Sequence, residues 1–199
     1  MPCFFQEYKP LHLTKYDENT SKGGKRVNNF IIIESGCADG DFVRASLIRH
    51  GVSVSGQGMA GFSLLSARSL EEIRDSRPDA LFMAPGAAAA PGRPVECGMA
   101  VIPGSSSLES ASRLLAQSVI SYGMSGRDTF TVSSLDDRVI MLTLQREIAS
   151  IKGRIIDRQD FAVNRFSRAS CEAHLLAAAA CIIAGVPAGA LYKRHIFSR

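Results

Sequence analysis

The stretch MAVIPGSSSLESASRLLAQSVISYG, from Met99 to Gly123, decides which fold we expect. It opens with the apolar run Met99–Ile102 and closes with the run Val119–Tyr122, and a turn containing glycine follows each run. Between them, Ser106–Glu109 forms a capping box, which predicts a helix with apolar residues from Leu108 to Leu115. A strand, a helix and a second strand at this spacing predict a parallel sheet with helical crossovers.

The chain before Met99 repeats this alternation. Asn29–Glu34 is a β-branched run typical of a buried strand, and Gly51 follows a helical pattern at the place of a left-handed C-cap. Ser69–Glu72 is a second capping box. In order, these patterns predict strands over 29–34, 52–55 and 80–84, and helices over 39–50 and from 69 to the residue before Arg77.

After Gly123 the pattern changes. Segments 129–133, 138–146 and 154–156 are rich in β-branched residues and predict antiparallel strands, and the alanine-rich run Ser170–Val186 predicts a long helix. The expected fold is therefore α/β: a mainly parallel sheet with helical crossovers, followed by an antiparallel strand pair and a closing Ala-rich helix. The expected organisation is a flexible N-terminal arm over 1–28 and a single α/β domain over 29–199, with a sub-boundary near 87–96.

Composition excludes several classes of protein. Of the 199 residues, 46% are hydrophobic and 21% charged, which predicts an ordinary packed core. The net charge of +4 is scattered, so nucleic-acid binding is not expected. The longest apolar stretch, Leu175–Val186, is shorter than the ~20 residues that cross a bilayer, and no signal peptide is evident, so no membrane role is expected. Five widely spaced cysteines without a C-x-x-C pattern indicate reduced thiols in a cytoplasm.

The turn after Ile102 and the turn after Tyr122 are the best candidates for a ligand site, because the carboxyl ends of parallel strands meet at one edge of a sheet. Main-chain amides at a helix N-terminus attract anions, and an arginine can clamp a phosphate or carboxylate. The sequence therefore predicts a site for a small anionic ligand, such as a nucleotide or sugar phosphate. Alternatively, the serines only cap their own helix, and Arg127 pairs with Asp128 in a turn. The candidate residues are Gly104, Ser105, Ser106, Ser107, Gly123, Ser125 and Arg127.

Motifs for cofactors and catalysis are incomplete. Gly56–Gly61 matches G-x-G-x-x-G, but the strand before it is weak and no acid ends the following strand, which favours a glycine turn. Gly24-Lys25 lacks the Ser or Thr of a phosphate-binding P-loop. Around Ser125, Arg127 takes the place of the second glycine of a nucleophile elbow. No cofactor is identified, and these departures favour a non-catalytic or accessory module over an enzyme.

Two alternatives to simple ligand binding come from the alanine-rich helix. Cys171 and His174 are three residues apart, a spacing that allows a thiol–imidazole pair, so a thiol or serine enzyme using Cys171–His174 or Ser125 stays open. Small buried cysteines that only pack are the more ordinary interpretation. The apolar run Leu175–Val186 also allows a protein–protein interaction or homo-oligomer through this helix.

Residues 101–186 resemble the end of the central domain of the Mur ligases, the ATP-dependent amino-acid ligases of peptidoglycan synthesis. The resemblance lies in Val101–Gly104, in Val119–Ser125 with its Tyr-Gly pair, in the β-rich sequence that follows, and in His174–Val186. It covers under half of the chain. The P-loop that grips ATP in that family is missing, and neither the His-Asn pair before the alanine helix nor the context of a carbamylated lysine is evident. The resemblance therefore implies a relative that lacks ligase chemistry.

Overall fold

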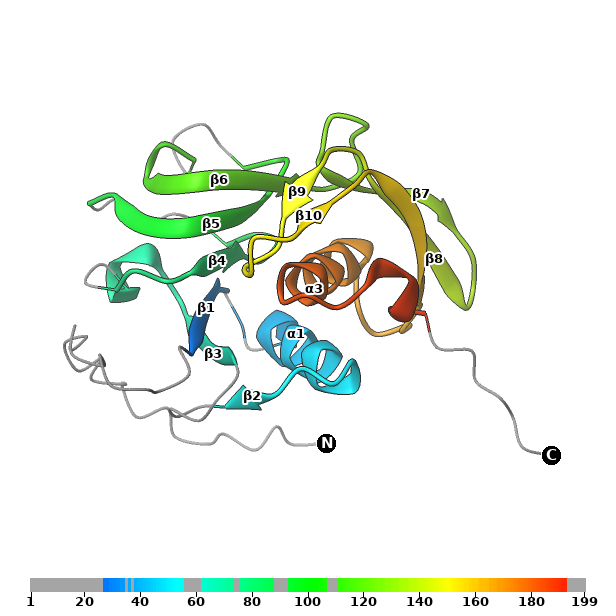
Figure 1. Cartoon of the computed structure of the whole chain (residues 1–199), viewed down its shortest axis with the longest axis horizontal. Coiled ribbons are helices and arrows are strands. Elements are labelled where there is room, and N and C mark those ends of the chain that lie inside the picture. Colours follow the sequence, from blue (N-terminus) through cyan, green and yellow to red (C-terminus); the bar gives the residue numbers. More distant parts are fainter. Residues whose placement is uncertain are drawn as a thin grey trace.

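The structure is a computed structural model that describes residues 27–34, 36, 38–55, 62–73, 76–87, 93–106 and 111–192. Among these residues, nine strands form one sheet in the order β11-β8-β7-β6-β5-β4-β1-β3-β2 (Figure 1). The strands are β1 (Asn28–Ile33), β2 (Val54–Ser55), β3 (Phe62–Ala67), β4 (Ala80–Met83), β5 (Val95–Pro103), β6 (Leu114–Tyr122), β7 (Phe130–Leu135), β8 (Val139–Leu144) and β11 (Gln159–Asn164).

Pairing in the sheet is parallel from β2 to β7 and antiparallel from β7 through β8 to β11. A separate antiparallel pair is formed by β9 (Ile148–Ala149) and β10 (Ile155–Ile156). The strands β6 and β7 pair only through Tyr122 and Phe130, and beyond this point β7 and β8 curve around the helices (Figure 1). The expected α/β fold, with a mainly parallel sheet and antiparallel strands after it, is confirmed.

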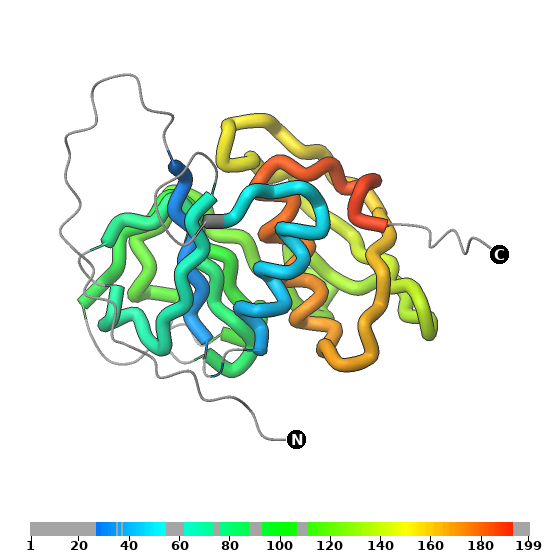
Figure 2. Tube along the Cα trace, turned by 90° about the horizontal axis from the view of Figure 1, so that it is seen from below, coloured from blue at the N-terminus to red at the C-terminus, as the bar shows by residue number. Residues whose placement is uncertain are grey.

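Two α-helices lie side by side against one face of the sheet: α1 (Ala38–Arg49) and α3 (Cys171–Ile183) (Figures 1 and 2). Each begins and ends for a local reason. The Ser170 hydroxyl caps α3 by accepting the Ala173 N–H at 3.0 Å. Gly51 and Gly185 follow the two helices with φ of 78° and 100°, a left-handed conformation that glycine adopts without strain.

The central strands β1 and β4 are buried on both faces of the sheet, which explains their apolar residues. In β1, Phe30 and Ile32 point to the core that contains both helices, whereas Ile31 and Ile33 point to a second core on the other face. A 3-10 helix, η1 (Leu70–Ile73), covers part of that second face through both of its terminal residues. A continuous apolar run without alternation is typical of such a two-sided central strand.

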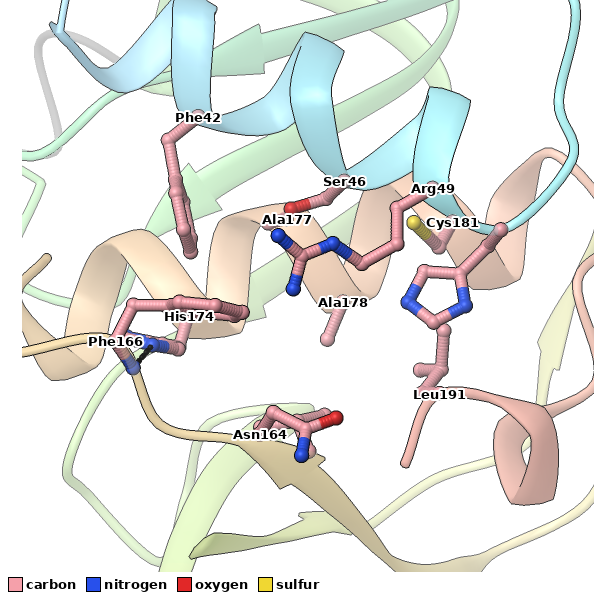
Figure 3. Close-up of a pocket in the computed structure, with 12 residues that line it drawn as sticks. Phe42, Ser46, Arg49, Asn164, Phe166, His174, Ala177, Ala178, Cys181 and Leu191 are labelled. Atoms are coloured by element: carbon pink, nitrogen blue, oxygen red, sulfur yellow. Dashed lines mark hydrogen bonds between the residues drawn. The ribbon is translucent and has the colours of Figure 1, made fainter. Parts of the chain in front are cut away.

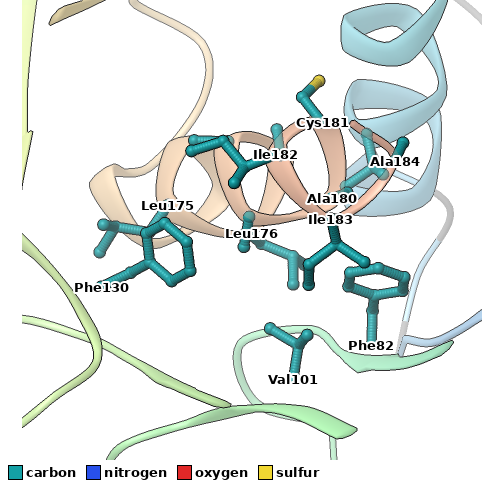
Figure 4. Packing of buried hydrophobic residues seen from close by; sticks show 14 of the residues in the cluster. Phe82, Val101, Phe130, Leu175, Leu176, Ala180, Cys181, Ile182, Ile183 and Ala184 are labelled. Carbon is teal, nitrogen blue, oxygen red and sulfur yellow. The ribbon is translucent and has the colours of Figure 1, made fainter. Parts of the chain in front are cut away.

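The helix α3 is an interior element. Every residue from Ala173 to Ala184 is buried, and the side chains of Leu175, Leu176 and Ile183 face strand residues such as Phe82 (Figure 4). The short 3-10 helix η2 (Ala188–Ala190) follows it and adds Ala188 to the same core. The helix that was predicted to mediate a homo-oligomer or dock a partner thus keeps no exposed face from Ala173 to Ala184, and the homo-oligomer stays a prediction.

Several boundaries differ from the predicted ones. Leu114 and Leu115, expected on a helix, begin β6 because Leu114 pairs with Val95 of β5. The capping box Ser69–Glu72 opens a single 3-10 turn instead of a longer helix. The strands β3 and β11 were not predicted.

Some predicted features lie outside the described residues: Ser107, the glycine turn Gly56–Gly61, and the arm up to residue 26. The proposed sub-boundary near 87–96 falls between β4 and β5, which are paired neighbours in the sheet. Among the described residues, no helix combines the length and apolar character needed to cross a bilayer.

Candidate functional site

The two turns singled out from the sequence lie next to each other at the carboxyl edge of the sheet. Pro103 at the end of β5 is in register with Tyr122 at the end of β6. The chain then links the turns directly, since the Gly104 N–H donates to the Tyr122 carbonyl at 2.7 Å. Residues 103–106 and 123–128, here called the rim, therefore bring together Gly104, Ser105, Ser106, Gly123, Ser125 and Arg127.

The carboxylate of Asp128 lies between the two turns and is only 5% exposed. A Cβ added to Gly104 would stand 2.7 Å from Asp128 Oδ2, and one added to Gly123 would stand 2.6 Å from the same oxygen. Real Cβ atoms do not approach an oxygen so closely, so both glycines are needed to admit the carboxylate. Asp128 thus fixes the shape of the rim, a role that the sequence did not reveal.

Five main-chain amides of the candidate residues in the rim are already bonded within the chain. The Gly104 N–H donates to Tyr122 O at 2.7 Å, the Ser106 N–H to Pro103 O at 2.9 Å, and the Gly123 N–H to Phe130 O at 3.0 Å. The Ser125 N–H donates to Asp128 Oδ2 at 3.1 Å, and the Arg127 N–H donates to Ser125 Oγ at 3.2 Å. The predicted cradle of unpaired amides is therefore not formed by these five residues. Side chains remain as the means of binding: Ser105 and Arg127 are exposed and Ser106 is half-buried.

A second arginine joins the rim from the segment after β8. Arg146 Nη2 donates to the Arg127 carbonyl at 3.2 Å, and both arginines are exposed. The Arg146 side chain therefore reaches the loop that carries Arg127, and Gly104 bonds the turn that holds Ser105 and Ser106 to the end of β6, just before that loop. Sequence reasoning missed Arg146 because nothing in the local pattern links it to a loop 19 residues away.

A third feature of the carboxyl edge is Glu34, the residue directly after β1. Its Oε2 accepts the Gly40 N–H at 2.7 Å, and the side chain is buried. Burial raises the pKa of the Glu34 carboxyl above its ordinary value, while the hydrogen bonds from Gly40 and Ser66 oppose that rise. The sequence identified Glu34 only as the end of a strand.

The Cys171–His174 pair does not form a thiol–imidazole base. His174 Nδ1 donates to Ser170 O at 2.7 Å, because a carbonyl can only accept. His174 Nε2 accepts the Phe166 N–H at 3.0 Å, because an amide N–H can only donate (Figure 3). Both ring nitrogens are thus occupied by the main chain. His174 holds the chain between β11 and α3 and has no nitrogen left to activate Cys171.

The serine alternative has no more support than the thiol one. Ser125 Oγ accepts the Arg127 N–H at 3.2 Å, a bond that belongs to the turn. The other cysteine of this helix, Cys181, is buried, and burial raises the pKa of its thiol to about 12, which leaves it protonated and inert at neutral pH. Within the described part of the chain, no group of three His, Cys, Asp or Glu side chains could hold a metal ion.

His174 predicts a pH dependence of stability. Burial lowers the pKa of its imidazole below 6.5, so the unfolded chain takes up the proton at a higher pH than the folded chain. The contribution of His174 to folding is therefore complete above about pH 6.5 and is lost as the pH falls towards the lower folded-state value. Urea denaturation at several pH values from about 7.5 to 5 should show the free energy of unfolding falling with pH. The same series on His174→Gln should show a smaller fall, and an identical fall would contradict this role.

One small cavity opens beside His174, between α1, β11 and α3 (Figure 3). Phe42 and Phe166 line it, and the Arg49 guanidinium lies 4.4 Å from the centre of the Phe166 ring. Its volume of about 40 Å³ holds about three water molecules. Nucleotides and sugar phosphates need a far larger space, since ligand pockets of that kind measure roughly 300 Å³ or more.

Fold and rim together define the class: an α/β protein with a mainly parallel sheet, antiparallel strands at one end, and polar loops at the carboxyl edge. A solved structure of UDP-N-acetylmuramoyl-L-alanyl-D-glutamate–2,6-diaminopimelate ligase is similar to this chain, with a TM-score of 0.56 and 12% identity over 85% of this chain and 45% of that one. A structure of UDP-N-acetylmuramoylalanyl-D-glutamyl-2,6-diaminopimelate–D-alanyl-D-alanyl ligase from Acinetobacter baumannii matches with a TM-score of 0.48 and 10% identity, over 85% of this chain and 46% of that one.

At this level of identity, the likeness to the first ligase shows the fold alone. It confirms the resemblance to the Mur ligases as a resemblance of fold, and the chain spans less than half the length of either ligase. No family model and no curated protein matches the sequence.

Proposed function

We propose that this chain is a non-catalytic or accessory module that binds a small anionic ligand, a nucleotide or a sugar phosphate, at the rim. The observation that carries the proposal is the contact of Arg146 with the loop of Arg127, which follows β6 next to the turn that holds Ser105 and Ser106. Guanidinium groups bind phosphate oxygens through paired N–H donors, and serine hydroxyls bind phosphate or sugar oxygens.

The buried carboxylate of Asp128 limits where the anion can lie. Because Asp128 fills the space between Gly104 and Gly123, a phosphate is repelled from the inner part of the rim. The anion therefore binds on the outer side, against the exposed arginines, and a neutral sugar ring lies nearer the serines. Such a site is open to solvent, so affinity should be modest and should fall as salt is added.

The similar ligases suggest which probes to test first. The name of the first one contains a UDP-linked amino sugar, which carries a diphosphate between its uridine and sugar groups. UDP-N-acetylglucosamine, UDP, ATP, glucose 6-phosphate and inorganic phosphate form a series that separates sugar, nucleotide and bare anion. A ligand present at a hundred times its Kd should raise the free energy of unfolding by about 2.7 kcal/mol, which a thermal-shift assay detects.

Two arginine variants then locate the site. Arg127→Ala and Arg146→Ala should each raise the Kd of the best probe roughly fivefold, the equivalent of about 1 kcal/mol for one exposed charged hydrogen bond. Titration calorimetry on the full chain measures both. The matched control is Arg138→Ala, which removes an exposed arginine at the opposite end of β7. If no probe stabilises the chain, or if Arg138→Ala weakens binding as much as the rim variants, the proposal fails.

A further inference from the structure

The order of the strands marks one point of the sheet as the usual place for a ligand. From β1 the chain passes to β2 and β3 on one side and then returns to β4 on the other side of β1. The carboxyl ends of β1 and β4 therefore flank the point at which the direction of winding reverses. In open α/β sheets, ligands bind in the crevice outside such a reversal.

The residue that occupies this point is Glu34. Its main-chain N–H continues the sheet by donating to the Ala67 carbonyl at 3.0 Å, and its side chain turns towards the first turn of α1. There the carboxylate accepts the Gly40 N–H at 2.7 Å and contacts the Ser66 hydroxyl. Only 4% of Glu34 is exposed. A carboxylate of the protein thus lies where the first amides of a helix would receive an external anion.

The fit around this carboxylate is close. A Cβ added to Gly40 would collide with Glu34 Oε1 and would stand 2.8 Å from Ser66 Oγ and 2.9 Å from Glu34 Cδ. The position therefore needs a glycine so that the Glu34 side chain can reach the helix. The acidic side chains of Asp39 and Asp41, both in the first turn of α1, add negative charge around the same point.

We propose that Glu34 acts as an internal anion that occupies the amide site at the start of α1 and excludes phosphate groups from the point of reversal in the sheet. This contact is a specificity determinant, because it leaves the rim as the place for an anionic ligand. The exclusion of phosphate by Glu34 does not depend on whether the rim binds an anion. Removal of the carboxylate opens an amide site for phosphate, although Asp39 and Asp41 continue to weaken binding there.

The test follows the main-chain amide of Gly40 by 15N NMR while pyrophosphate is added to the full chain. In the unchanged protein, the Gly40 signal should stay in place. In Glu34→Ala it should move and saturate as pyrophosphate fills the emptied amide site. Glu34→Gln, which removes the charge but keeps the side chain in position, should respond less than Glu34→Ala. The signal of Gly126 reports on the rim in the same spectra, so the two sites are read separately.

The matched control is Asp39→Asn, which removes a neighbouring charge without emptying the position. If it moves Gly40 as much as Glu34→Ala does, general charge is responsible and the proposal is wrong. It is equally wrong if Gly40 of the unchanged protein responds to pyrophosphate, or if a folded Glu34→Ala variant does not respond. Should Glu34→Ala fail to fold, Glu34→Gln decides: the Gly40 signal of this variant must move when pyrophosphate is added, while that of the unchanged protein stays in place.

Discussion

Leu176→Ala is expected to lower the free energy of unfolding by about 2–5 kcal/mol, the usual cost of removing a large buried aliphatic side chain. Leu176 is 0% exposed and lies on α3, with the sheet on one side and α1 beside the helix (Figure 4). The residues around it belong to both layers, so the cavity left by the substitution cannot collapse by the movement of one loop. Urea denaturation of the purified chain measures the change.

Leu176→Met is the matched control, because it keeps the volume and should cost less than about 1.5 kcal/mol. Size-exclusion chromatography with light scattering completes the comparison. If α3 served mainly to bind a second copy of the chain, Leu176→Ala would change the oligomeric state and leave the stability of the folded chain nearly unchanged. That result would contradict the interior position of the helix.

Gly104→Ala is expected to have the second largest effect, a loss of about 1–3 kcal/mol from overpacking. The new methyl group would overlap the carboxylate of Asp128, standing 2.5 Å from its Cγ. Because Asp128 is buried between two turns and accepts the Ser125 N–H at 3.1 Å, it cannot move aside without breaking that bond. The expected loss therefore measures how firmly the rim is held, and thermal or urea denaturation records it.

A double-mutant cycle identifies the cause of this loss. Asp128→Ala alone should cost about 1 kcal/mol, since the Ser125 N–H loses its acceptor. In that background Gly104→Ala should cost little more, so the two changes should differ from additivity by about 1 kcal/mol or more. Gly126→Ala is the control in the same loop, because a Cβ there meets no atom within 4 Å. Additive losses, or an equal loss for Gly126→Ala, would show that the overlap with Asp128 is not responsible.

Local patterns predicted the elements whose causes are local. The helix α1 follows from apolar spacing and ends where Gly51 takes a positive φ, and α3 begins at the hydroxyl of Ser170 and is followed by Gly185. The apolar runs inside β1, β4 and β5 were recognisable because burial on both faces favours consecutive apolar residues. These signals act over a few residues, so the sequence displays them directly.

The candidate rim was predicted in part. The meeting of the turns after Pro103 and Tyr122 follows from the parallel alternation of strands and helices, which places their carboxyl ends on one edge. The state of the amides could not be predicted, because each finds its acceptor through the particular path of the loop. The nearness of Arg146 depends on how β8 returns beside β7, a path with no counterpart in the local sequence.

By itself, the sequence determined the class of fold, the positions of α1 and α3 and the presence of turns after Pro103 and Tyr122. Only the tertiary structure decided that α3 is interior, that Asp128 fills the rim, and that Glu34 closes the start of α1. The physical reason is the range of the interactions. Capping, alternation and glycine turns involve neighbours in the chain, whereas bonds such as the one from the Tyr122 hydroxyl to the Met83 carbonyl, 2.7 Å long across 39 residues, exist only once the whole sheet has assembled.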